Sequence, residues 1–180
     1  MKEEELAQQT PASLRLAQAE YFLGEYIRHC GPPVDSYFGM VCCFDAFLFA
    51  FVSVEEMVNE EMKKKLNEDS KFRFFKALRN ITTHHSILSA PIDGKFLRPF
   101  SRSIEMSVGN TQNESSRLSL NFNVLREILD AVELERKQER YTIAYAREFL
   151  KEMEDTGNKV FIEDLMRNTL DSIKQMLANS

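Results

Sequence analysis

The stretch Tyr37–Val52, with the sequence YFGMVCCFDAFLFAFV, is the most apolar segment of the chain and decides how the rest must fold. Its apolar residues occupy almost every side of a helix, so the pattern predicts a central helix that other helices cover. The run contains Asp45 and is too short and too polar to cross a membrane. We expect this helix to extend from about Val34 to about Leu66, with its charged second half projecting into solvent.

Further helices are predicted on both sides of this segment. Thr10 and Pro11 are typical of a helix start, and Asp69 with Ser70 offers the start of another helix that reaches about Leu88. Along that helix an apolar stripe recurs at helical spacing, formed by Phe74, Leu78, Ile81, His85 and Leu88. Helical patterns also cover about residues 123–156 and 160–178, and we interpret Tyr141 and Tyr145 as part of the apolar residues of the first of these.

Between the helices the apolar period changes to two. Ile104, Met106 and Val108 alternate with polar residues, as do Leu118 and Leu120, and a polar loop separates the two runs. This pattern predicts a β-hairpin inserted at about 102–122. The fold class is therefore mainly α: an up-down helical bundle of about five helices with one inserted β-hairpin, forming a single domain over 1–180.

Composition narrows the classes of function. The 180 residues are 43% hydrophobic and 28% charged with a net charge of -5, which excludes a disordered chain and a broad basic coat for duplex nucleic acid. The acidic N-terminus has no apolar signal region, so we expect a soluble cytoplasmic protein. Cys30, Cys42 and Cys43 are expected to be reduced core thiols, and no metal-ligand spacing or cofactor motif is present.

The segment Arg79-Asn80-Ile-Thr-Thr83-His84 is the strongest candidate for chemistry. At about 100° per residue, these four side chains lie on the side of the helix opposite the apolar stripe, where His85 belongs. A guanidinium can hold a phosphate and an imidazole can move a proton, which are the two groups that metal-free phosphodiester cleavage needs. The alternative is a polar helix face that only meets solvent.

The same segment resembles the signature of the HEPN superfamily, Arg-Asn-x-x-x-His followed by a proline, here Pro91. The segment Phe44–Val54 is similar to a helix that precedes this signature in one bacterial branch. The resemblance covers about residues 10 to 90. It implies a helical bundle that dimerises, so that the arginine and histidine of both subunits line one cleft. Many members are metal-independent endoribonucleases of toxins or of phage defence, and others are catalytically silent binding modules.

The resemblance assigns roles by position. Arg79, Asn80 and His84 match the motif, and Asp45 takes the place of an upstream polar residue. The tyrosine that the toxin branch carries two residues after the histidine is here Ser86. Asp45 would pair with Arg79 or orient His84. The alternative is a structural contact with Arg28 or a backbone N–H, because a buried carboxylate needs a partner.

The expected function is cleavage of RNA through the ribose 2′-OH without a metal or other cofactor. Arg73, Lys76 and Thr83 lie near the motif and are candidate RNA-binding residues. The expected partners are RNA, a second copy of the chain, and an antitoxin or regulatory protein, with no membrane. The alternative is a silent module that binds a nucleotide, RNA or a partner protein with the same polar face.

Overall fold

The computed structural model describes residues 10–30, 37–85, 104–107, 117–120, 140–157 and 160–179, and the positions 122, 125–126, 129–130 and 133. Six α-helices are present in these ranges: α2 (Pro11–Cys30), α3 (Tyr37–Val52), α4 (Glu60–Glu68), α5 (Ser70–His85), α8 (Arg140–Asp155) and α9 (Ile162–Ala178). The prediction of a mainly helical protein is confirmed. None of the described helices is long and apolar enough to cross a membrane.

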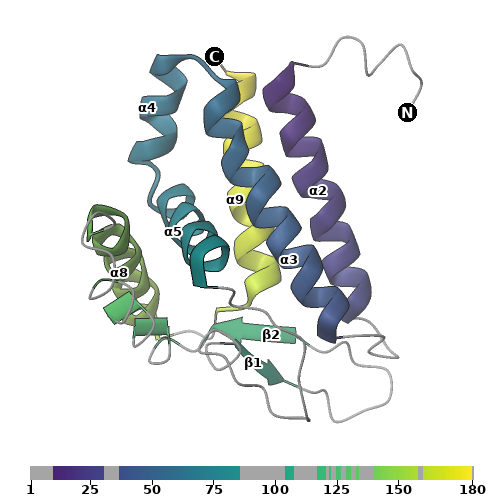
Figure 1. The fold of residues 1–180 in the computed structure, drawn as a ribbon, viewed down its shortest axis with the longest axis vertical. Coiled ribbons are helices and arrows are strands. Elements are labelled where there is room, and N and C mark those ends of the chain that lie inside the picture. Colours follow the sequence, from purple (N-terminus) through teal and green to yellow (C-terminus); the bar gives the residue numbers. More distant parts are fainter. Residues whose placement is uncertain are drawn as a thin grey trace.

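The helices pack in a continuous row. α2, α3 and α9 run alongside one another, α5 lies beside α3 at a slant, and α8 lies on the far side of α5 (Figure 1). α3 contacts α2 on one side and α5 on the other, while α5 also packs against α8 and α2 against α9. The helix α5, which carries the Arg79–His84 segment, is therefore held between two other helices rather than on the outside of the molecule.

Phenylalanines join α3, α5 and α8 into one core. The rings of Phe47 and Phe51 stack at 5.3 Å, and Phe75 meets each of them edge-on at 5.6 Å. On its other side α5 contacts α8, where Phe74 lies 4.7 Å from Phe149. Each aromatic pair adds about 0.5–1.5 kcal/mol beyond the burial of its area. α3 is central as predicted, although Phe49 on its outer side is 57% exposed.

The single long helix predicted from about Val34 to Leu66 is wrong, because the chain divides after Val52. A 3₁₀ turn, η1 (Ser53–Met57), follows α3, and α4 starts separately. The Asn59 side chain caps α4 by accepting a hydrogen bond from the Met62 N–H at 2.9 Å. Asn59 is therefore a helix-start residue that the apolar periodicity alone does not reveal. The charged segment also does not simply project into solvent, since Glu55 and Met62 are buried.

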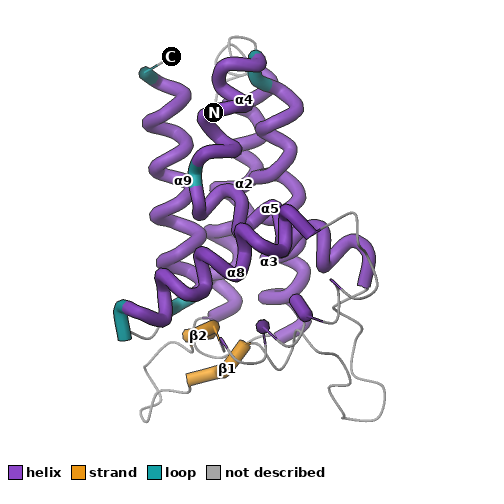
Figure 2. Tube along the Cα trace, turned by 90° about the vertical axis from the view of Figure 1, so that its left-hand side faces the viewer, coloured by secondary structure: helices purple, strands orange, loops and turns teal. Residues whose placement is uncertain are grey.

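Two short strands lie at one end of the helices, beneath them in Figure 2. β1 (Ile104–Ser107) and β2 (Arg117–Leu120) pair antiparallel, with Ile104 opposite Leu120 and Ser107 opposite Arg117. The rest of the segment 102–122, including the polar loop, lies outside the described residues, as does most of 123–139. The hairpin as a complete unit stays a prediction.

A close contact fixes the approach of α2 and α3. The His29 ring lies against Gly39, where a Cβ atom would come within 2.7 Å of the ring, so only glycine fits there without movement. The cysteines differ from the expectation of three core thiols. Cys30 is buried beside Met40, whereas Cys42 is exposed and Cys43 is half-buried. Cys42 is exposed because α2 and α5 cover the other sides of α3.

Candidate functional site

The Arg79–His84 segment lies in the helix α5. The Asp69 carboxylate caps this helix by accepting a hydrogen bond from the Phe72 N–H at 2.7 Å. Arg79 and Asn80 are half-buried. The side chains of Thr83, His84 and His85 lie outside the described residues, although the helix itself runs through His85. The interval between the motif residues is therefore helical, which gives them the relative positions that the spacing predicts.

The apolar stripe of α5 is confirmed where it is described, since Phe74 and Leu78 are almost fully buried. Burial extends beyond the stripe to Ala77, three residues before Asn80, which is only 1% exposed. The neighbouring helix α8 packs against α5, where its Phe149 meets Phe74 of the stripe.

Asp45 is half-buried on α3, the helix that packs against α5. Its Oδ1 atom is buried and accepts no hydrogen bond within the described part of the chain, so the predicted contact with Arg79 or Arg28 is not made through this oxygen. Arg28 instead contacts Glu25 at 2.7 Å. Burial raises the pKa of the Asp45 carboxyl to about 6, because the charged form loses water. The carboxyl can therefore exchange a proton close to neutral pH.

Lys76 is engaged inside the protein. Its Nζ atom lies 2.7 Å from the Glu55 carboxylate on η1 and also donates to Asn67 of α4 at 3.1 Å. Asn67 donates to Glu55 at 2.7 Å. Burial alone would raise the pKa of Glu55, but these hydrogen bonds outweigh it and hold the pKa below its ordinary value. The contacts that the structure gives Lys76 are structural, and its role in RNA binding stays a prediction.

Arg73 has a different partner, which the sequence did not indicate. Its guanidinium lies 3.9 Å from the centre of the Tyr145 ring on α8, an ordinary cation–π distance. Tyr145 is 39% exposed and Tyr141 is 80% exposed. These tyrosines, which the sequence groups with the apolar residues of the helix, therefore lie on its exposed side. The spacing of four residues was visible in the sequence, but only the packing of α8 shows which side faces outward.

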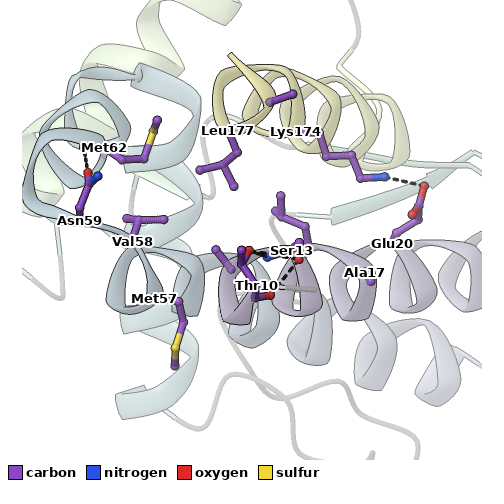
Figure 3. A pocket seen from close by; sticks show the side chains of 13 residues that line it. Thr10, Ser13, Ala17, Glu20, Met57, Val58, Asn59, Met62, Lys174 and Leu177 are labelled. Carbon is purple, nitrogen blue, oxygen red and sulfur yellow. Dashed lines mark hydrogen bonds and ion pairs between the residues drawn. The ribbon is translucent and has the colours of Figure 1, made fainter. Parts of the chain in front are cut away.

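Two hollows lie away from this region. One, of about 500 Å³, is formed by the start of α2, the junction of η1 with α4, and the end of α9 (Figure 3). Its polar side chains contact each other: Lys174 pairs with Glu20 at 2.6 Å, and Thr10 accepts from Ser13. The other, of about 520 Å³, is an apolar groove between α2 and α3. Among the residues predicted to act on RNA, none of those whose side chains the structure describes lines either hollow.

The described residues contain no group of three or more His, Cys, Asp or Glu side chains arranged to hold a metal ion. The described functional groups of the region are the Arg79 guanidinium and the Asn80 carboxamide on α5 and the Asp45 carboxyl, with its raised pKa, on α3.

In comparisons with known proteins, no family model, no curated protein and no solved structure matches the chain.

Proposed function

We propose that the protein is a metal-independent endoribonuclease of HEPN type. The observation that carries this proposal is the Arg-Asn-x-x-x-His segment, residues 79–84, which lies wholly within the helix α5 with Arg79 and Asn80 half-buried. Its guanidinium and carboxamide are groups that can hold a phosphate. The Asp45 carboxyl, whose pKa burial raises to about 6, lies on the neighbouring helix α3 and is the candidate supporting group.

In the proposed reaction the ribose 2′-oxygen attacks the adjacent phosphorus atom while the bond to the 5′-oxygen breaks. His84 takes the proton from the 2′-OH or gives one to the leaving 5′-oxygen. Arg79 holds the phosphate and stabilises the charge that grows on its oxygens. Asn80 orients His84 or contacts a phosphate oxygen, and the ionised Asp45 supports the protonated histidine.

The biological setting follows from the same resemblance. We infer that the enzyme acts in the cytoplasm as a homodimer, as a toxin or a phage-defence nuclease, and that an antitoxin or regulatory protein controls it. The dimer matters chemically because a second subunit would cover the half-buried Arg79 and Asn80 and remove water from the site.

A catalytically silent module that binds a nucleotide, RNA or a protein is the second candidate. Two observations favour it. Lys76 is neutralised by Glu55, which lowers the positive charge available to RNA. The net charge of the chain is -5. In this reading the motif residues bind a ligand but transfer no proton.

Cleavage of RNA by the purified protein in the presence of EDTA tests the proposal. We expect products that end in 2′,3′-cyclic phosphate, because the neighbouring 2′-OH is the nucleophile. His84→Ala is expected to lower the rate by roughly 10²–10⁴-fold, the usual contribution of a general acid or base. Arg79→Ala is expected to lower it by a similar factor, because its charge matters most in the transition state.

His85→Ala is the matched control. The two histidines are adjacent, and the helical phase predicts that His85 shares the stripe of Phe74 and Leu78, so its loss should lower stability more than rate. An equal loss of rate in both variants would show that the faces of α5 are assigned wrongly. A wild-type protein that binds RNA but cleaves none would contradict the enzyme and support the silent module.

A further inference from the structure

Two exposed tyrosines on α8 do not serve the core. Tyr141 and Tyr145 are four residues apart and so lie on the same face of the helix. Tyr141 is 80% exposed, whereas Ile143, Ala146 and Phe149 on the inner face are fully buried. The inner face already packs α8 against the rest of the protein. The Tyr141 ring therefore adds little to the packing of the core, and the Tyr145 ring is exposed in part.

The guanidinium of Arg73 is held against one of these rings. It lies over Tyr145 at 3.9 Å, and its Nε atom is buried without a hydrogen-bond partner in the described part of the chain. The same described ranges show no carboxylate within ion-pair distance of it, whereas Arg126 and Arg147 each pair with acidic side chains. The Tyr145 ring thus positions the Arg73 guanidinium, which can still bind an anion such as a phosphate.

Arg73 also lies on the motif's side of α5. At about 100° per residue, positions 73, 80 and 84 lie within about 40° of one another around the helix. At the rise of an α-helix, the backbone positions of Arg73 and His84 are about 16 Å apart. A ligand that contacts both must be extended rather than a single nucleotide.

We infer that Tyr141, Tyr145 and Arg73 form a subsite for single-stranded RNA, in which bases stack on the tyrosine rings and a phosphate contacts Arg73. The inference rests on the proposed function, because it extends the same site along the strand. Stacking on exposed aromatic rings is the common way in which proteins hold unpaired bases, and an arginine beside the ring adds a cation–π contribution.

The charges on α8 indicate along which part of the helix the RNA strand runs. Glu148 and Glu152 are exposed three and seven residues after Tyr145, on the same face. Their negative charge repels phosphates from that end of the helix. The strand is therefore expected to pass from Tyr145 toward Tyr141, away from the two carboxylates. Duplex RNA, whose bases are already stacked on one another, cannot use the rings in this way.

Fluorescence anisotropy with labelled oligoadenosine tests the subsite. The measurement uses the His84→Ala protein, so that binding is measured without cleavage. Tyr141→Ala in this background is expected to weaken binding by about 5- to 150-fold, the usual value of one stacked base. Tyr141→Phe, which keeps the ring, is expected to bind normally. Arg73→Gln should weaken binding and reduce its dependence on salt.

Tyr21→Ala is the matched control, because Tyr21 is a 63% exposed tyrosine on α2, at the other side of the molecule from α8 (Figure 1). Equal affinities of the Tyr141→Ala and Tyr21→Ala proteins would overturn the subsite. If wild-type protein still cleaved RNA in that case, the proposed function would stand without it. Tyrosine-dependent binding without any cleavage by the wild type would support the subsite and contradict the nuclease. No binding of single-stranded RNA would overturn the inference and point to a protein partner.

Discussion

Asp45 shows how burial changes the chemistry of a single residue. The carboxyl is half-buried in α3, and burial raises its pKa from 3.8 to about 6. A folded-state pKa above that of the unfolded chain means that the protein is relatively more stable when the group is protonated. The advantage is complete below pH 3.8 and is lost as the pH rises through about 6.

Asp45→Asn should therefore stabilise the protein in a pH-dependent way. At pH 4 the variant and the wild type should melt at similar temperatures, whereas at pH 7.5 the variant should be more stable by about 1 kcal/mol, or a few °C. The expected difference is small because a half-buried carboxyl remains partly hydrated, which reduces the energetic effect of its burial. Thermal melts across this pH range check the prediction.

Asp171→Asn, on the exposed face of α9, controls for the loss of one negative charge. A lower melting temperature of Asp45→Asn at pH 7.5 would show that the ionised carboxylate is stabilised by a partner. If Asp45 also acts in catalysis, the same substitution should remove the rise in cleavage rate near pH 6 while it raises stability, a combination typical of functional residues.

At the scale of elements, the contact between Lys76 and Glu55 ties η1 and α4 to α5. Glu55 is 9% exposed and receives hydrogen bonds from Lys76 and Asn67. Removing one member of a buried pair leaves the other charge without a partner, which costs more than the pair contributes. The contact also decides the position of α5, because it holds the first half of that helix against the turn after α3.

Lys76→Met is expected to lower the free energy of unfolding at pH 7 by about 1–3 kcal/mol, because it leaves Glu55 buried without its cation. Urea unfolding measures this. The double variant Glu55→Gln with Lys76→Met should lose less than the sum of the single losses. Since the pKa of Glu55 is lowered, the contribution of the pair is present at neutral pH and disappears as the pH falls through the pKa of the folded state.

Lys64→Met, on the exposed side of α4, is the control for losing a lysine and should leave stability almost unchanged. The same variants separate structure from RNA binding. If Lys76 contacts RNA, the folded Lys76→Met protein should bind oligoadenosine more weakly than the Lys64→Met protein. Equal RNA affinities together with lower stability would assign Lys76 to the helix junction alone.

For the whole molecule, the proposed function implies that a second copy of the chain completes the site. Arg79 and Asn80 are only half-buried, and electrostatic stabilisation of a phosphate is weak where water reaches it. A two-fold axis would bring two such segments together and exclude water from both. Light scattering at micromolar concentration is expected to give a mass near twice 20.9 kDa. A monomer at that concentration would contradict the shared cleft.

The sequence by itself determined that α3 is central and which side of α5 faces inward, although it did not reveal the break after Val52. The apolar run of residues 37–52 predicted a central helix because no polar side was available for solvent, and the stripe of Phe74 and Leu78 predicted the buried face of α5. Both predictions depend on local spacing, because the spacing of residues along a helix fixes the side of the helix on which each side chain lies. The motif residues Arg79, Asn80 and His84 were placed on one helix for the same reason.

Only the tertiary structure decided which helix faces are covered by other helices and which are exposed. The packing of α8 leaves Tyr141 and Tyr145 facing outward. The break after Val52 brings Glu55 to Lys76, which lies 21 residues later. The raised pKa of Asp45 likewise depends on what surrounds it. Spacing along one helix cannot reveal these features, because they arise from contacts between segments that the folded chain brings together.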